Sequence, residues 1–174
     1  MSEYPRGWRN SGLGWWPLGL AMLALDQFTK ELVQRMMALH DFIYVLPVLD
    51  IVHARNTGAA FSFLAEQGGW QRWFFTGFAL LVSAGLLIVL RRAGHVQRLQ
   101  NAGLMLIVSG ALGNVIDRIR HGYVVDFVHA HWGDASFPAF NVADSCITIG
   151  AGFIVIDALL EWRRERRVAK GKVQ

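Results

Sequence analysis

The sequence is poor in charged residues and almost without cysteine. Charged side chains make up 17% of its 174 residues, whereas a soluble domain of this length carries about a quarter. Hydrophobic residues make up 53%, and the mean hydropathy is +0.32, so the shortage of charge indicates a membrane protein. The single cysteine, Cys146, excludes an internal disulfide framework. We expect it to pack as a small apolar residue.

Several other features are absent as well. No internal repeat, low-complexity linker or soluble domain is visible, so residues 1–174 are interpreted as a single integral-membrane domain. The apolar stretch that follows Arg6 and Arg9 is not followed by a small-x-small cleavage site, which favours a retained span over a cleaved signal peptide. The basic residues lie at the ends of apolar runs rather than in one patch. We therefore expect no nucleic acid partner.

Four segments are long and apolar enough to be candidate transmembrane helices, which need roughly 20 mostly apolar residues. They cover residues 15–35, 73–90, 99–116 and 140–160. The second and third contain no charged residue, whereas Asp26 and Lys30 interrupt the first and Asp144 and Asp157 lie in the fourth. The sequence therefore predicts an all-α membrane protein with four spans.

The distribution of lysine and arginine predicts the orientation of these spans, because cytoplasmic loops are enriched in both residues. If the N-terminus is cytoplasmic, most of the 17 basic residues fall on the cytoplasmic side. These are Arg6, Arg9, Arg91, Arg92, Arg98 and the basic residues of the C-terminal run RRERRVAKGK. We expect both termini to lie in the cytoplasm.

The outer segment between the first two spans, residues 42–69, is too long for a simple turn. Its beginning, FIYVLPVLDIVHAR, is rich in β-branched and aromatic residues and is broken by Pro47, a pattern that favours two short strands over a further span. Gly58 and the small residues after it allow close approach of the backbone. We expect a small outer β element followed by a short amphipathic helix.

The polar residues within and beside the spans fall at one depth, near the outer surface. An ionisable residue inside a membrane costs at least about 2.5–3.5 kcal/mol, so each one suggests a partner or a function. This set contains Asp26, Lys30, Asn114, Asp117, Arg118, Asp126, Asn141 and Asp144. The second span has no charged residue at all, so the composition of the chain does not by itself require polar residues to gather at this depth.

Structural ion pairs account for part of the set. Asp26 and Lys30 are spaced i, i+4 on one helix face, and Asp117 is adjacent to Arg118, so we expect those two pairs. Asp126 and Asp144 then remain without an obvious cationic partner. Two carboxylates in a poorly hydrated site tend to share one proton, as in aspartic proteases, and are therefore candidates for acid–base catalysis.

Two alternatives remain for the polar residues. His129 and His131 would point the same way on a strand and, with His121, Asp126 or Asp134, could hold zinc; no HExxH motif supports this, and we expect no metal or other cofactor. A solute transporter would place its polar groups near the midplane of the bilayer and often shows paired repeats. Here the groups lie near one surface and no repeat is visible, which disfavours a transporter. A purely structural scaffold would not need two unpaired aspartates at one depth.

Five sequence blocks, in this order, resemble the signature blocks of lipoprotein signal peptidase, also called signal peptidase II. They are DQFTK (26–30), NTGAAFSF (56–63), GALGNVIDRI (110–119), GYVVDFV (122–128) and FNVADSCITIG (140–150). The resemblance extends over nearly the whole chain. It implies four transmembrane helices with a periplasmic β-cradle and a short periplasmic helix in the bacterial inner membrane.

The resemblance also implies an activity and a site. Members of this family are aspartyl endopeptidases that cut the signal peptide from prolipoproteins just before the lipid-modified cysteine, without a metal. The implied catalytic dyad is Asp126 and Asp144. The implied supporting positions are Asp26, Lys30, Asn56, Gly110, Asn114, Arg118, Asn141 and Ala143. The expected partners are lipid-modified prolipoproteins, membrane lipids and globomycin-type inhibitors; the active site is expected near the periplasmic surface of a monomer.

Overall fold

The computed structural model describes residues 7–58, 69–133 and 135–171. Its long helices are α1 (Trp16–Met36), α2 (Trp70–Arg92), α3 (Arg98–His121) and α4 (Val142–Gly171), preceded by the short 3-10 helices η1 (Trp8–Asn10) and η2 (Gly12–Trp15). Its strands are β1 (Phe42–Leu46), β2 (Leu49–Asn56), β3 (Val124–Trp132) and β4 (Ala135–Ser136). The short helix expected after Gly58 falls at residues 59–68, outside the described residues.

Each of the four predicted spans lies largely within a long helix, but three of these helices qualify as membrane spans by length and composition. Among the described residues these are α2, α3 and α4. Helix α1 contains Asp26, Lys30 and Glu31 within 21 residues and is more polar. Helix α4 begins at Val142, two residues later than expected, and is 30 residues long.

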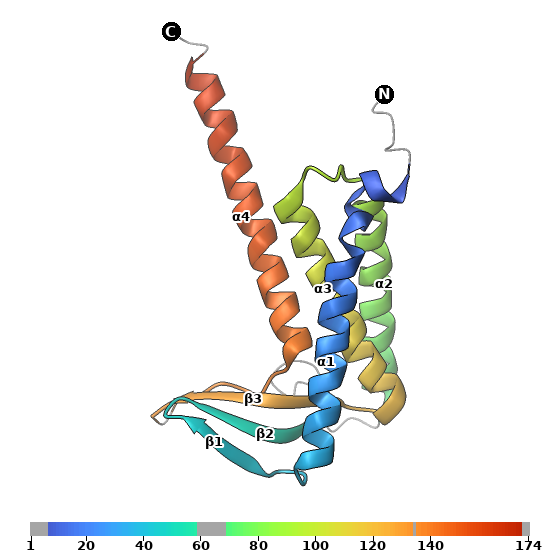
Figure 1. The fold of residues 1–174 in the computed structure, drawn as a ribbon, viewed down its shortest axis with the longest axis vertical. Helices are drawn as coiled ribbons and strands as arrows, with labels where there is room; N and C mark the ends of the chain where they lie inside the picture. The colour runs from blue at the N-terminus through green and yellow to red at the C-terminus, as the bar shows by residue number, and fades with distance from the viewer. Residues whose placement is uncertain (1–6, 59–68, 134, 172–174) are drawn as a thin grey trace.

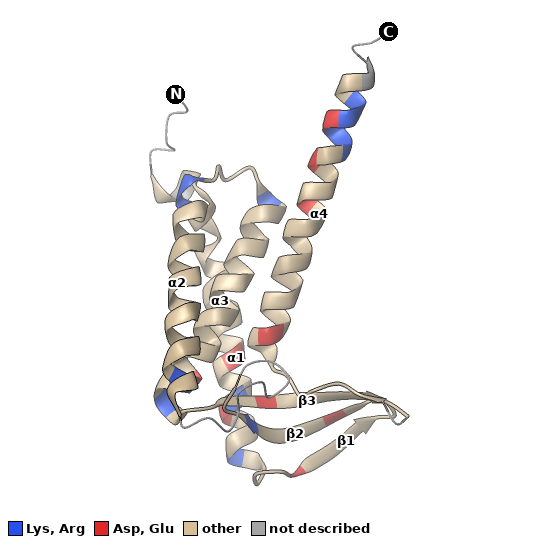
Figure 2. Ribbon diagram, turned by 180° about the vertical axis from the view of Figure 1, so that it is seen from behind, with Lys and Arg blue, Asp and Glu red and all other residues tan. Residues whose placement is uncertain are grey.

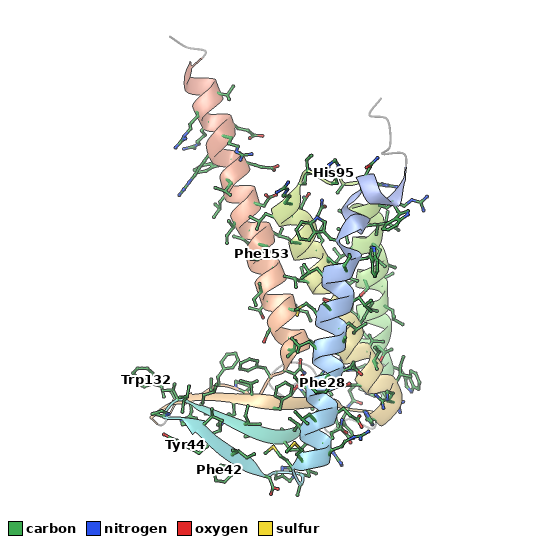
Figure 3. The ribbon with its side chains drawn as sticks, in the orientation of Figure 1. Phe28, Phe42, Tyr44, His95, Trp132 and Phe153 are labelled. Atoms are coloured by element: carbon green, nitrogen blue, oxygen red, sulfur yellow. The ribbon has the colours of Figure 1, made fainter. Side chains whose placement is uncertain are left out.

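Helix α3 lies at the centre of the bundle and packs against α1, α2 and α4. In the apolar stretch of α3, 72% of the residues are buried inside the protein, whereas the buried share is 17% in the apolar stretches of α2 and α4. The outward side chains are large and apolar, as Figure 3 shows for Phe28 on α1, which is 65% exposed. A helix that exposes such residues outward is suited to a lipid environment.

Close contact between α3 and α4 depends on glycine. A Cβ atom on Gly103 would lie 2.7 Å from the carbonyl oxygen of Gly150, and one on Gly150 would lie 2.5 Å from the carbonyl oxygen of Gly103. A Cβ on Gly110 would collide with the carbonyl oxygen of Ala143. Small residues therefore let the two backbones approach, as is common between membrane helices.

The antiparallel sheet has the strand order β1-β2-β3-β4 and projects sideways from one end of the bundle, beneath the lower end of α4 (Figure 1). The two strands predicted from the segment between the first two spans are confirmed as β1 and β2. Helix η1 and the C-terminal end of α4 lie at the opposite end of the bundle. The sheet therefore lies on the opposite side of the apolar layer from η1 and the C-terminal end of α4.

The charged residues follow the same division. Figure 2 shows the middle of α2 and α3 free of colour, with blue and red gathered near the sheet, blue at the opposite ends of α2 and α3, and blue and red along the far half of α4. Gly122 ends α3 with a positive φ of 86°, a conformation that suits glycine. The chain then enters β3 at Val124, so this tight turn places Asp126 beside the end of α3.

Candidate active site

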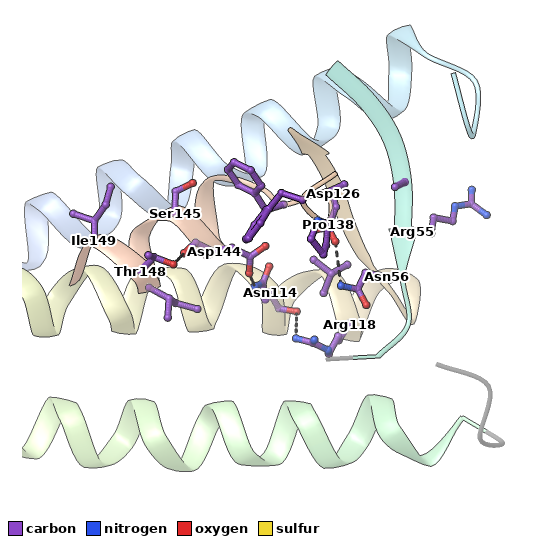
Figure 4. Close-up of a pocket in the computed structure, with 16 residues that line it drawn as sticks. Arg55, Asn56, Asn114, Arg118, Asp126, Pro138, Asp144, Ser145, Thr148 and Ile149 are labelled. Atoms are coloured by element: carbon purple, nitrogen blue, oxygen red, sulfur yellow. Dashed lines mark hydrogen bonds between the residues drawn. The ribbon is translucent and has the colours of Figure 1, made fainter. Parts of the chain in front are cut away.

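A cavity of about 880 Å³ opens between the sheet and the ends of α3 and α4 that lie near it. Its walls come from β2, β3, α3, α4 and the segment before α4. The polar side chains that line it include Asn56, Asn114, Arg118, Asp126 and Asp144 (Figure 4). The structure thus brings the two unpaired aspartates of the sequence to one cavity.

Asp126 lies on β3 opposite Ala54 of β2, beside an irregularity in the pairing of the two strands. Its side chain is buried, and each carboxylate oxygen accepts a hydrogen bond. Asn56 Nδ2 donates to Oδ2 at 3.1 Å, and Asn141 Nδ2 donates to Oδ1 at 2.7 Å. Burial, followed by the nearby charge of Asp144, raises the pKa of Asp126 to about 7.

Asp144 lies in the first turn of α4 and helps to begin that helix. The Oδ1 of Asn141 accepts a hydrogen bond from the backbone N–H of Asp144 at 2.9 Å, and Asp144 Oδ2 accepts one from the N–H of Asn141 at 3.3 Å. This reciprocal arrangement is a capping box, here with the pattern Asn-x-x-Asp. The catalytic candidate is therefore held by the same bonds that set the start of α4.

Two asparagine side chains connect the carboxylates. Asn114 on α3 donates from Nδ2 to Asp144 Oδ1 at 2.8 Å. Asn141 donates from Nδ2 to Asp126 Oδ1, and the same nitrogen lies 3.3 Å from Asn114 Oδ1. The two amides thus form one network that reaches both aspartates.

A buried ionic cluster lies behind this network. Lys30 Nζ is 2.9 Å from Asp26 Oδ2 and 3.1 Å from Asp117 Oδ2, and it donates to Asn114 Oδ1 at 2.9 Å. The predicted pair of Asp26 with Lys30 is confirmed. The predicted pairing of Asp117 with Arg118 is wrong, because Asp117 points inward to Lys30 across the contact between α1 and α3.

Arg118, Ala143 and Gly110 lie at the borders of the site. The Arg118 guanidinium donates to the carbonyl oxygens of Gly58 at 3.1 Å and Asn114 at 3.5 Å. Ala143 is fully buried, and its N–H donates to Asp26 Oδ1 at 2.8 Å. Gly110 lies directly against Ala143, so a larger residue at either position would separate α3 from α4.

Of the zinc ligands considered from the sequence, His129 and His131 lie side by side, with ring centroids 5.6 Å apart, but they do not face Asp126. His131 Nε2 lies 3.1 Å from Asp50 Oδ2, and His129 Nε2 lies 2.7 Å from the hydroxyl of Ser136. Both histidines therefore face β2 and β4 rather than Asp126, and Asp134 lies outside the described residues. Among those residues, no three histidine, cysteine or acidic side chains are placed to hold a metal ion.

One contributor to the site, Gln27, was not predicted from the sequence. Gln27 donates from Nε2 to Asp26 Oδ2, to the Gly113 carbonyl and to Asp117 Oδ1, at 3.1–3.2 Å. No local pattern identifies this role. The Asn-x-x-Asp pattern at Asn141, in contrast, is a signal that could have located the start of α4.

Comparison with known proteins identifies one family. The family model described as Signal peptidase (SPase) II matches residues 18–160. The lipoprotein signal peptidase of Shewanella woodyi is 45% identical over 155 residues, covering 89% of this chain and 88% of its own. That of Actinobacillus succinogenes is 45% identical over 150 residues, covering 86% of this chain and 92% of its own.

The fold is similar to that of solved membrane proteins as well. Two structures, both described as a bacterial membrane enzyme, are 33% identical to this chain. The first has a TM-score of 0.77 and covers 87% of this chain and 91% of its own. The second has a TM-score of 0.76 and covers 86% and 96%.

Proposed function

The chain belongs to the signal peptidase II family of membrane peptidases, and we propose that it is an aspartyl endopeptidase that processes prolipoproteins. Its substrates carry a diacylglyceryl group on a cysteine, and the bond that it cuts is the one just before that cysteine. The main support for this proposal is that Asp126 and Asp144 line the same cavity.

The two carboxylates can activate a water molecule without a covalent intermediate. The ionised member removes a proton from water, while the protonated member donates a hydrogen bond to the scissile carbonyl oxygen. The pKa of about 7 for Asp126, raised by burial and by the charge of Asp144, supports a shared proton near neutral pH. This chemistry needs no metal or other cofactor.

The supporting residues hold the two aspartates and the substrate. Asn114 and Asn141 orient the carboxylates through the bonds described above, and Asn56 holds Asp126 from β2. Arg118 fixes the backbone at Gly58 beside the cavity. Gly110 and Ala143 allow α3 and α4 to approach, while Asp26 and Lys30 stabilise the network from behind.

The position of the cavity suits a substrate anchored in lipid. Apolar residues of α4 and of the segment before it, among them Phe140, Ile147 and Ile149, line the cavity beside the aspartates. We expect the signal helix to enter sideways between the helices while its diacylglyceryl chains remain in the bilayer. Globomycin-type cyclic peptides are expected to compete for the same cavity.

The topology that we propose has four membrane crossings. Helix α1 can cross because its charged residues at depth, Asp26 and Lys30, are both 1% exposed and paired with each other. The protein is then one inner-membrane domain and a monomer, with both termini in the cytoplasm. The sheet and the cavity face the periplasm.

Cleavage of a lipidated precursor tests the proposal. Wild-type protein reconstituted in lipid should cut a diacylglyceryl-modified prolipoprotein, leave the unlipidated precursor intact and keep its activity after thorough chelation. Asp126→Asn and Asp144→Asn should each abolish cleavage while the purified variants still unfold cooperatively. Near-normal cleavage by either variant would remove that aspartate from the reaction.

A further inference from the structure

Asp117 is a buried carboxylate that the proposed reaction does not use. It is 2% exposed and lies on α3, one turn before the helix ends. Its Oδ2 accepts a hydrogen bond from the backbone N–H of Val125 at 3.1 Å and lies 3.1 Å from Lys30 Nζ, and its Oδ1 accepts one from Gln27 at 3.1 Å. One side chain therefore joins α1, α3 and β3.

These bonds lead to both aspartates. Val125 immediately precedes Asp126 on β3, so its bond to Asp117 fixes the backbone of the strand beside Asp126. Lys30, held by Asp117 and Asp26, donates to Asn114 Oδ1. Because an ammonium group only donates, it holds the oxygen of Asn114 toward itself and leaves the NH₂ group to donate to Asp144.

The charge of Asp117 also acts on the site. Charged groups face the cavity or lie just behind it on each surrounding element: Asp26 and Lys30 on α1, Arg55 on β2, Asp117 and Arg118 on α3, Asp126 on β3 and Asp144 on α4. Asp117 brings a formal negative charge to this cluster, opposite in sign to that of Lys30 beside it. A buried charge is poorly screened, so a negative charge at Asp117 disfavours ionisation of the two aspartates.

We propose that Asp117 is a positioning residue of the peptidase reaction, which fixes β3 and Lys30 and, through its charge, sets the pH range in which the two aspartates share one proton. This inference rests on the proposed function. According to this inference, the pH range of activity depends on the ionic cluster of Asp26, Lys30 and Asp117 as well as on the two aspartates themselves. The cluster therefore has a measurable effect beyond stability.

The pH profile of kcat separates this role from a purely structural one. Removal of the negative charge in Asp117→Asn favours the ionised carboxylates, so both limbs of the profile should move to lower pH. The expected displacement is roughly half to one pH unit, less than the about 1–3 units typical of a charge in direct contact. Asp117→Glu keeps the charge, so its limbs should stay in place even if its kcat falls.

Two further variants complete the experiment. Asp26→Asn removes the other carboxylate that faces Lys30 and should move the limbs in the same direction. Asp50→Asn removes a negative charge that lies against His131 instead, and should leave the limbs nearly unmoved. Thermal unfolding of each purified variant shows whether it is folded.

The outcomes distinguish this inference from the proposed function. If wild-type protein cleaves the lipidated precursor but Asp117→Asn lowers kcat without moving either limb, the inference is overturned and the proposed function stands. Failure of both Asp117→Asn and Asp26→Asn to fold would also overturn it, since the cluster would then serve folding alone. Absence of cleavage by wild-type protein would count against the proposed function itself.

Discussion

The side chain of Asn141 reaches the two aspartates through different atoms. Its Nδ2 donates to Asp126 Oδ1, and its Oδ1 caps α4 by accepting the N–H of Asp144. The first bond holds a carboxylate in place for the proposed acid–base chemistry, whereas the second contributes to the stability of a helix. A substitution can therefore remove one role and keep the other.

Two variants of Asn141 should separate these roles. Serine is a good N-cap but cannot donate an amide hydrogen bond to Asp126, so Asn141→Ser should lower kcat by at least about 10²-fold with little change in Tm. Asn141→Ala should lose the same activity and, in addition, about 0.5–2 kcal/mol of stability. Kinetics in lipid and thermal unfolding in detergent measure the two effects. Equal Tm values for both variants would contradict the capping role.

Asp126 should also make the stability of the fold depend on pH. Burial and the charge of Asp144 raise its pKa from 3.8 to about 7, so the folded protein binds more protons than the unfolded chain between those values. Stability that is present below about pH 4 is then lost as the pH rises through about 7. We expect the Tm of the wild-type protein to fall between about pH 5 and pH 8, and that of Asp126→Asn to fall less. Equal slopes would contradict the raised pKa.

At the scale of the elements, the contact between α3 and α4 sets the position of Asp144. Gly110 of α3 lies against the backbone of Ala143 of α4, one residue before Asp144. A Cβ on Gly152, which also lies on α4, would meet no atom within 4 Å. Gly110→Ala should therefore displace the first turn of α4, costing about 1–3 kcal/mol and most of the activity. Gly152→Ala is the matched control and should change neither activity nor Tm appreciably. Similar losses in both variants would contradict a specific contact at Gly110.

The elements differ in how far the sequence predicts them. Long apolar runs predict the four helices, and β-branched residues around Pro47 predict β1 and β2. Strand β3 was not predicted as a paired element, because its partner β2 is distant in the sequence and no tight hairpin turn joins the two. The i, i+4 spacing predicts the pair of Asp26 with Lys30, but the partner of Asp117 depends on the packing of α1 against α3. Local patterns therefore locate the candidate residues, and only tertiary contacts show how they are joined.

At the scale of the whole molecule, the sheet and the far end of α4 lie on opposite sides of the apolar layer. Helix α4 has 30 residues and is therefore about 45 Å long, which exceeds the roughly 30 Å of a hydrocarbon core. Its basic end, with Arg163, Arg164, Arg166 and Arg167 exposed, extends beyond that core. By the positive-inside rule we expect this end in the cytoplasm, and therefore the sheet and the cavity, which lie on the other side of the apolar layer, in the periplasm.

Labelling of single cysteines tests this orientation. Cys146 is the only cysteine in the sequence and is buried, so Cys146→Ser provides a background without a reactive thiol. In that background Trp132→Cys, at a position 79% exposed on β3, should react in intact spheroplasts with a maleimide that cannot cross membranes. Val168→Cys, at a position 59% exposed near the end of α4, should react only after the membrane is permeabilised. Labelling of Val168→Cys in intact spheroplasts would place the C-terminus outside, and because η1 lies at the same end of the bundle, it would invert the whole proposed topology.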